Sequence, residues 1–489
     1  MLRVSVAALL LAASLPAAAQ PSGLPSMGAA SSVDLSPALE QRLGDAIMVQ
    51  GRRDPTYVDD VDLSQYLTDM GRKLAAHAPG GAPTIQVFGV RDPSINAFAL
   101  PGGYIGINTG LIVSSETESE LAGVLAHEIG HVSQRHIARG FTQQSRTGTM
   151  MMATVAASLL AALAGGSADL AAGMAAFGQA AAINQQLGFS RDAEREADRA
   201  GLDMLSRGGY DPTGMARMFG RLMNVSRLNE GAGGGAYATT HPLSIERMSD
   251  VQNRVRNAAP SYHVDTADFW FLRARLRLLQ ANDAQGQRVV VQQLNNEVQS
   301  LSGRRQAAAR YGLAVHALAN GQTARVGELI AQIRAAGEDI PLVARLEIES
   351  AWAAKDNARA LQLAQAAFKR WPQRRSLGYA YAQSLHNDGR YRETIAFLRE
   401  RQGDWAQDDP RLFQLMAQSA DKLGEPVAAR RDMARFYTAM GALPAAVSQL
   451  QQARSMSNDF YEQSQIDVEI REAKERLAQE RELLERFKS

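Results

Sequence analysis

His127-Glu128-Ile129-Gly130-His131 is the stretch that decides how this chain is interpreted. On an α-helix, two histidines four residues apart lie on the same face, about one turn apart. Both imidazoles can then bind one metal ion, and the glutamate between them can hold the water that the metal activates. The stretch therefore predicts a zinc peptidase site on a helix, with His127 and His131 as ligands and Glu128 as the general base.

A catalytic zinc ion needs a third protein ligand and one open position for water. His136 follows His127 by nine residues, which would place it roughly 180° around a continuous helix. We therefore exclude it as a ligand and expect it to be solvated or satisfied in the core.

The segment from Ser190 to Asp198 supplies a better candidate. Glu194 and Asp198 are four residues apart and share a helix face, whereas Glu196 points roughly 200° away from Glu194 and is expected to be solvated. We assign Glu194 as the third ligand and Asp198 as the carboxylate that orients His127 from behind. The alternative is a salt-bridged helix, because arginines flank these carboxylates on the same segment.

The N-terminus has the pattern of a secretory signal peptide over residues 1–19, followed by a flexible leader over residues 20–34. Arg3 precedes the apolar run from Val4 to Leu15, and three alanines end at Ala19. The alternative is an uncleaved anchor. The chain has no cysteine, which excludes disulfides, cysteine protease chemistry and a cysteine-linked lipid. A disulfide-free exported chain suits a bacterial periplasm, and a net charge of +1 gives no field that favours nucleic acid.

We expect an α+β catalytic domain over residues 35–262, with a small sheet and the active-site helix. Helical periodicity covers residues 35–76, and residues 84–90 resemble a strand. Two extended segments, 96–100 and 104–107, flank a glycine turn. Longer helical patterns follow at residues 116–139, which carry the histidine pair, and at 190–205.

Residues 140–188 form an unusual apolar region. Its two apolar runs, 150–164 and 171–183, each fall short of the roughly 20 residues that span a bilayer. They are interpreted either as a pair of buried helices or as a mobile flap beside the active site. A flap would allow peripheral contact with hydrophobic substrate or membrane.

The remainder of the chain is expected to be an α-solenoid over residues 263–457, closed by a capping helix over 458–489. Turn signals recur at Gly321, Asp356-Asn357, Gly389 and Gly424, roughly 33 to 36 residues apart, which is the period of a helix-turn-helix repeat. The segment from Tyr379 to Phe397 fits the tetratricopeptide pattern best. The predicted fold is therefore mainly α.

With these motifs in place, the chain resembles the zinc endopeptidase family that includes the CAAX-prenyl proteases and the HtpX membrane proteases. The matching residues are Asn96-Ala97-Phe98-Ala99, the motif at 127–131, Ser190-Arg191, Glu194, Ala197-Asp198, His241-Pro242 and Arg247. The resemblance implies a zinc metalloprotease with one Zn2+ per chain. The signal segment and repeats make the chain most similar to periplasmic members that help outer-membrane barrel proteins to assemble and degrade stalled ones. The implied partners are unfolded or misassembled outer-membrane proteins and, through the repeats, the barrel-assembly machinery.

Three further assignments concern the substrate and the open metal position. His241 or Arg247 is expected to stabilise the oxyanion that forms during peptide cleavage. His241 could instead act as a removable fourth ligand that keeps the enzyme latent. Asn96, Ala97 and Phe98 are expected to lie on an edge strand that holds substrate by strand addition, the alternative being an ordinary internal hairpin.

A non-enzymatic repeat scaffold or chaperone with a structural or residual metal site is the competing function. Structural zinc sites are usually closed by four ligands, often cysteines, and this chain has no cysteine. An intact Glu128 has little use in such a site. These two features favour the enzyme, although a repeat array can also bind proteins independently of catalysis.

Overall fold

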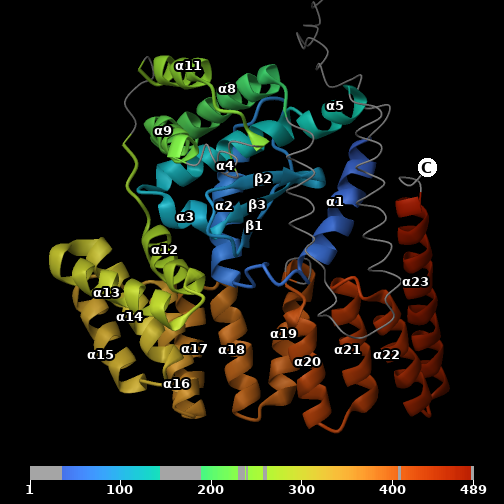
Figure 1. The fold of residues 1–489 in the computed structure, drawn as a ribbon. Coiled ribbons are helices and arrows are strands. Elements are labelled where there is room, and N and C mark those ends of the chain that lie inside the picture. The colour runs from blue at the N-terminus through green and yellow to red at the C-terminus, as the bar shows by residue number, and fades with distance from the viewer. Residues whose placement is uncertain are drawn as a thin grey trace, which may run out of the picture.

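A small β-sheet surrounded by helices forms the upper part of the molecule in Figure 1, and a row of helical hairpins forms the lower part. This computed structural model describes residues 36–143, 189–228, 237, 240–256, 262–405 and 409–485. The prediction of a mainly α fold with a small sheet and a helical repeat region is confirmed. The predicted signal peptide and leader, and the apolar runs at 150–164 and 171–183, lie outside the described residues.

The sheet has three strands in the order β1-β3-β2, comprising Gln86–Val90, Tyr104–Asn108 and Ala97–Leu100. β1 pairs with β3 in parallel, and β2 pairs with β3 as an antiparallel hairpin. The hairpin turns through Pro101–Gly103, where Gly103 has a φ of 81°. A Cβ at Gly103 would lie 2.0 Å from the carbonyl oxygen of Thr84, so glycine is required there. The predicted strands and glycine turn are confirmed.

Two helices precede the sheet, α1 (Pro37–Gly51) and α2 (Val61–Ala75). The sequence pattern suggested one continuous helical stretch, but the helix is interrupted between α1 and α2. The carboxylate of Asp54 accepts hydrogen bonds from the backbone amide and hydroxyl of Thr56 at 2.8 and 2.7 Å. The short extended link then forms a bridge with the end of β1, and Asp60 caps α2 by accepting from the amide of Leu63.

The histidine motif lies on α4 (Glu118–Ser133), which follows the short α3 (Thr109–Ser114). The prediction of one helix from residue 116 to 139 is wrong near its end, where two residues interrupt it. α4 ends at Ser133, Arg135 adopts a φ of 52°, and a separate helix α5 (His136–Gln143) begins. The break turns His136 away from the position that a continuous helix would give it.

Three helices complete the upper part, α8 (Arg191–Arg207), α9 (Thr213–Leu228) and α11 (Ile245–Arg256). α8 confirms the helix predicted for 190–205 and packs closely along α4. Small residues allow this approach, because a Cβ at Gly130 would lie 2.9 Å from the Cα of Ala197. The close contact brings Glu194 and Asp198 within reach of the histidines on α4.

The helical hairpins below the sheet follow one another from α12 to α23 (Figure 1). Gly321, Gly389 and Gly424, predicted to be turns, have φ values of 71°, 79° and 73° between paired helices. Their assignment to the tetratricopeptide class stays a prediction. The twelve helices are α12 (Ala267–Gln280), α13 (Ala284–Ser300), α14 (Gly303–Ala319), α15 (Thr323–Ala335), α16 (Pro341–Ala353), α17 (Asn357–Arg370), α18 (Arg375–Asn387), α19 (Tyr391–Trp405), α20 (Arg411–Lys422), α21 (Pro426–Ala439), α22 (Leu443–Met456) and α23 (Phe460–Glu485).

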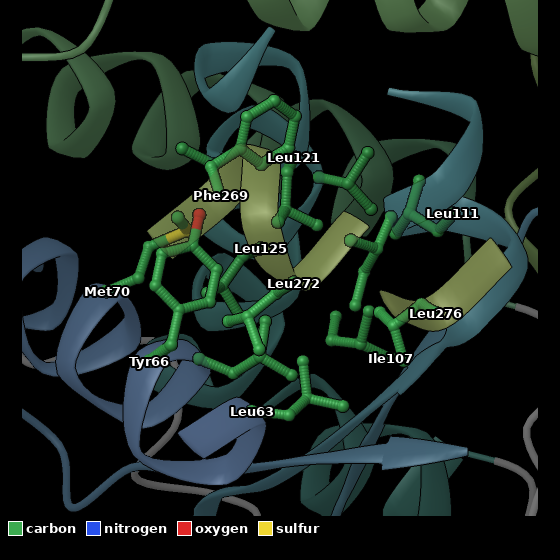
Figure 2. Close-up of a cluster of buried hydrophobic side chains, with 14 of the residues drawn as sticks. Leu63, Tyr66, Met70, Ile107, Leu111, Leu121, Leu125, Phe269, Leu272 and Leu276 are labelled. Atoms are coloured by element: carbon green, nitrogen blue, oxygen red, sulfur yellow. The ribbon is translucent and has the colours of Figure 1, made fainter. Parts of the chain in front are cut away.

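One hydrophobic core joins the sheet, α2, α3 and α4 to the first of these helices. Figure 2 shows Leu63, Leu121 and Leu125 packed against Leu272 of α12. Their exposed fractions are 0–1%, so the core runs without interruption across the domain boundary predicted at residue 262. The boundary itself stays a prediction.

A second apolar cluster joins the two ends of the described chain. Leu43 and Ile47 of α1 and Phe88 and Phe98 of the sheet pack with Leu484 of α23. Figure 1 shows α23 beside α1 accordingly. The row of helical hairpins is thus attached to the upper part of the molecule at its last helix as well as its first.

Ion pairs attach three helices of the array to residues 59–62, which we call the acidic segment. Arg275 lies 2.6 Å from Asp60, Arg345 lies 2.8 Å from Asp62, and Arg411 lies 3.2 Å from Asp59. The three arginines come from three different helices of the array, α12, α16 and α20. None of the helices in the described part of the chain is both long and apolar enough to cross a membrane.

Candidate metal centre

Four buried side chains from three parts of the chain converge between α4 and α8. They are His127 and His131 of α4, Glu194 of α8 and His241, which lies just before α11. None of the four is more than 1% exposed. The Nε2 atoms of the two α4 histidines are 3.0 Å apart, and His241 Nδ1 lies 3.3 Å from His127 Nε2.

The donor set fits a tetrahedral zinc ion. Ligand atoms about 2.0–2.1 Å from such an ion would lie roughly 3.3 Å from one another. Glu194 places Oε1 3.4 Å from His131 Nε2 and 3.0 Å from His241 Nδ1, and its Oε2 lies 3.5 Å from His127 Nε2. Imidazole nitrogen and carboxylate oxygen are donors that zinc accepts.

Asp198 lies behind His127, as the spacing on α8 predicts. Its Oδ1 is 2.9 Å from Nδ1 of His127, which leaves Nε2 of that ring facing the other donors. Burial alone would raise the pKa of Asp198, but hydrogen bonds from His127 and Arg247 outweigh burial and lower it. The carboxylate is therefore ionised and accepts the proton of the ring.

Arg247 joins two carboxylates at the base of the centre. Its guanidinium donates to Asp198 through Nε and Nη2, both at 2.8 Å, and its Nη1 lies 2.6 Å from Glu194. Nη1 also donates to the backbone oxygen of Pro242 at 2.8 Å. These contacts indicate that Arg247 positions the two acidic side chains, and its predicted role as an oxyanion donor stays untested.

Glu128 is fully buried beside the cluster. Among the residues that the structure describes, neither of its carboxylate oxygens has a hydrogen-bond donor, and Oε1 lies 3.5 Å from His241 Nε2. A buried polar group without a partner is costly to maintain. Such a carboxylate is available to accept a proton from a molecule bound next to it.

His241 is held by aromatic neighbours. Its ring stacks on Tyr237 with centroids 4.7 Å apart, and the Phe189 ring lies 5.6 Å away with its plane tilted by 31°. The Tyr237 hydroxyl is buried and has no hydrogen-bond partner within the described ranges. Burial, with Glu128 nearby, raises its pKa well above the ordinary value, so the phenol is neutral. The sequence analysis missed both aromatic residues, because neither belongs to a spacing motif.

His136, which helix geometry excluded as a ligand, lies next to the candidate ligand His131. Its Nδ1 is 2.9 Å from Nδ1 of His131, on the side away from the donor cluster. Its Nε2 lies 3.0 Å from Glu196, which also accepts from Arg139 at 2.8 Å. Glu196, which was predicted to be solvated, is 31% exposed and also meets these two partners, since the break after α4 brings α5 against α8. Burial lowers the pKa of His136 to about 4 despite the contact with Glu196, so its ring is neutral.

Asn96, Ala97 and Phe98 lie at and within β2, which is an outer strand of the sheet. The backbone oxygen of Asn96 accepts from the amide of Asn108, while its buried side-chain oxygen has no partner among the described residues. Ala97 and Phe98 are 0% and 2% exposed and pack in the hydrophobic clusters. Substrate binding at this strand stays a prediction, and it would use the backbone rather than these two side chains.

Comparison with known proteins gives consistent matches in this part of the chain. Residues 62–255 match the family model of peptidase family M48. The beta-barrel assembly-enhancing protease of Escherichia coli strain K12 is 33% identical over 296 residues, 60% of this chain and 59% of the relative. That of Yersinia pestis is 32% identical over 324 residues, 64% of this chain and 65% of the relative.

A third relative matches a shorter stretch of the chain. The mitochondrial metalloendopeptidase OMA1 of Schizosaccharomyces pombe is 34% identical over 165 residues, which are 33% of this chain and 44% of the relative. In each of these comparisons the chain spans less than two thirds of the relative. The matched region contains every donor of the metal centre together with Glu128, Asp198 and Arg247. Residues 62–255 of this chain are therefore similar to the members of peptidase family M48.

Proposed function

We propose that this chain is a zinc-dependent endopeptidase of the bacterial periplasm that acts in outer-membrane protein assembly and quality control. The observation that carries the proposal is the buried donor cluster of His127, His131 and Glu194 beside the Glu128 carboxylate, which has no hydrogen-bond donor among the described residues. Zinc bound there would polarise the scissile carbonyl and make a water molecule acidic enough to lose a proton near neutral pH.

Glu128 carries the proton in this mechanism. Its carboxylate accepts the proton of the attacking water and returns it to the amine that leaves when the peptide bond breaks. The water must reach Oε1 or Oε2, and both are free of hydrogen bonds from the described residues. Asp198 and Arg247 hold His127 and Glu194 in place, because Asp198 contacts Nδ1 of His127 and Arg247 contacts Oε2 of Glu194.

His241 supports a latent form of the enzyme. Its Nδ1 lies 3.0 Å from Glu194 and 3.3 Å from His127, where the fourth donor of a tetrahedral ion would stand. We propose that this ring closes the position needed by water and leaves when a client binds. The alternative is an oxyanion donor that remains beside the metal, and the nearby Tyr237 ring fits either role by holding the imidazole.

A His241→Ala variant distinguishes the two roles of His241. We expect proteolysis of casein to rise several-fold, because removing the ring opens the metal position. His77→Ala, which removes a partly exposed histidine near the end of α2, is the control and should cleave at the wild-type rate. Loss of cleavage in His241→Ala, with zinc still bound, would reject the latent form and support the oxyanion donor.

The clients and the location rest on different support. The relatives from Escherichia coli and Yersinia pestis are named for the assembly of beta-barrel proteins, and the N-terminal sequence has the pattern of a signal peptide. We propose unfolded or misassembled outer-membrane proteins as clients, with the repeats contacting the barrel-assembly machinery. Peripheral membrane contact through 150–183 belongs to the same proposal and concerns residues outside the described structure.

Zinc analysis and a degradation assay on wild type and Glu128→Gln test the enzymatic function. We expect about one zinc per chain in both proteins, because Glu128 is not a ligand, and loss of nearly all cleavage of casein or an unfolded barrel protein in the variant. Full activity in a contaminant-free Glu128→Gln preparation would reject the mechanism. A wild type that binds clients without cleaving them would support the repeat scaffold instead.

A further inference from the structure

A chain of hydrogen bonds runs from the surface to His131 on the side opposite the metal cluster. It begins at Arg139, which donates to Glu196 at 2.8 Å, and continues from Glu196 to His136 at 3.0 Å. His136 then contacts His131 through the two Nδ1 atoms at 2.9 Å. Neither Arg139 nor Glu196 belongs to the metal centre, and both are partly exposed.

The direction of each hydrogen bond in this chain is fixed by its outer end. An ionised carboxylate only accepts, so Nε2 of His136 must donate to Glu196. With a proton on Nε2, the His136 ring can offer its lone pair at Nδ1, and the 2.9 Å contact between the two Nδ1 atoms then assigns Nδ1 of His131 as the donor. His131 then has its lone pair on Nε2, which is the atom that faces His127 and Glu194.

The two ligand histidines are thus oriented by different acceptors. His127 contacts the buried carboxylate of Asp198 directly, whereas His131 contacts the imidazole ring of His136, which is only 2% exposed. Behind that ring, the Glu196 side chain is 31% exposed and reaches solvent. If a buried carboxylate stood in place of His136, it would add charge to a centre that already holds Glu128, Glu194 and Asp198, and its desolvation would be costly. The imidazole transmits the orienting effect and leaves the charge at the surface.

The local backbone makes this contact possible. Arg135 has a φ of 52°, a conformation that residues other than glycine rarely adopt, and it reverses the chain between α4 and α5. Its side chain lies 3.1 Å from Glu40 of α1, which holds the turn against the rest of the fold. Phe189 stacks on the His131 ring with centroids 3.9 Å apart and limits rotation of that ring.

We propose that His136 is a positioning residue of the metal centre, which sets the tautomer and orientation of His131 through its Nδ1 atom and is itself set by Glu196. The inference rests on the proposed function only in taking His131 as a zinc ligand. Nδ1 of His136 orients His131, and Nε2 fixes the His136 ring by donating to Glu196.

Two amide substitutions separate the roles of the two nitrogens, because each places its amide group near a different nitrogen of the former ring. In His136→Asn the amide oxygen lies near the former Nδ1 and can still accept from His131, whereas in His136→Gln the amide lies near the former Nε2. We expect His136→Gln to bind zinc about 10–100-fold more weakly than wild type in competition with a chelator, and His136→Asn to remain within a few-fold. The absorption spectrum of the cobalt-substituted protein should change in His136→Gln and be preserved in His136→Asn.

Zinc affinity equal to wild type in His136→Gln, with an unchanged cobalt spectrum, would overturn the proposal. Equal losses in the two amide variants would overturn it as well, because they would indicate a packing role. Glu196→Ala provides a test at a partly exposed site should the buried variants fold poorly. It should weaken zinc binding measurably, and an unchanged affinity would reject the relay. A wild-type chain that binds zinc but cleaves nothing would contradict the proposed function and leave these affinity comparisons valid.

Discussion

Asp198 is the residue on which the buried charges of the metal centre depend. Its two oxygens serve His127 at 2.9 Å and Arg247 at 2.8 Å, and all three side chains are almost fully buried. A change that preserves shape but removes charge leaves the guanidinium with Glu194 as its remaining carboxylate. Removal of one partner from a buried ion pair costs far more than the pair contributes at a surface.

We therefore expect Asp198→Asn to lose stability and metal affinity together. The free energy of unfolding of the metal-free protein should fall by about 3 kcal/mol in urea denaturation, and zinc affinity should fall by about 10–100-fold. Asp192→Asn is the matched control, since Asp192 lies on the same helix with its side chain 85% exposed and should be nearly neutral. Wild-type stability in Asp198→Asn would contradict the assigned network.

Residue spacing was enough to anticipate part of this centre. Two histidines four apart and two carboxylates four apart bring their side chains to one face on any regular helix, and the structure places all four together. His136 could not be placed correctly, because its position depends on a helix end at Gln134-Arg135 that carries neither glycine nor proline. Tyr237 and Phe189 gave no signal at all, since stacking on a histidine leaves no spacing pattern.

At the scale of elements, the distance between α4 and α8 controls whether Glu194 reaches the histidines. Gly130 and Gly201 lie where the two helices touch, and a Cβ at Gly201 would lie 3.1 Å from the backbone nitrogen of His127. Backbone atoms lie opposite both glycines, and the Cε atom of Met215 would lie 2.9 Å from a Cβ at Gly201, so neither position can accept a side chain without a shift of its neighbours.

Gly130→Ala should separate the two helices. The new Cβ would lie 2.9 Å from the Cα and the carbonyl oxygen of Ala197, which are backbone atoms that cannot rotate away. We expect a loss of about 1–3 kcal/mol in unfolding free energy together with weaker zinc binding. Gly220→Ala on α9 has nothing within 4 Å of the added carbon and should be neutral or slightly stabilising. Unchanged zinc binding in Gly130→Ala would show that Glu194 tolerates the shift.

The elements themselves were mostly visible in the sequence, with failures at their ends. Glycine turns and alternating apolar residues identified the strands and most helical hairpins. The break between α1 and α2 was missed although Asp54-Pro55 is a turn signal, because apolar spacing continues on both sides of it. The position of this break depends on the bridge between Tyr57 and the end of β1, a contact between segments that a local sequence pattern does not reveal.

For the whole molecule, the attachment of the repeat array to the catalytic part was not predictable. The period of the repeats is a local property, but Arg411 and Asp59 are 352 residues apart in sequence and meet only in the folded chain. Asp62 is the most enclosed member of the acidic segment, 2% exposed, with Arg345 at 2.8 Å and Arg275 at 3.6 Å.

Asp62→Asn should loosen the array and remove part of the pH dependence of stability. Burial alone would raise the pKa of Asp62, but Arg345 and Arg275 outweigh burial and lower it below 3.8. A lowered pKa means that the stabilisation is present above pH 3.8 and is lost as the pH falls through the folded-state value. Unfolding between pH 7 and 3 should show a smaller loss in the variant than in wild type, and limited proteolysis at neutral pH should cut the variant faster. Identical pH profiles would reject this assignment.

The acidic segment also affects what the repeat array can bind. Because it belongs to the same chain, it meets the arginines of α12, α16 and α20 at an effective concentration on the order of millimolar. Any external ligand for these arginines must compete with the acidic segment, which is covalently part of the same chain. Only tight or multivalent ligands can displace it. Weak ligands are therefore kept from these arginines without any steric barrier. A client that displaces the acidic segment also breaks the ion pairs that hold the array to the rest of the molecule.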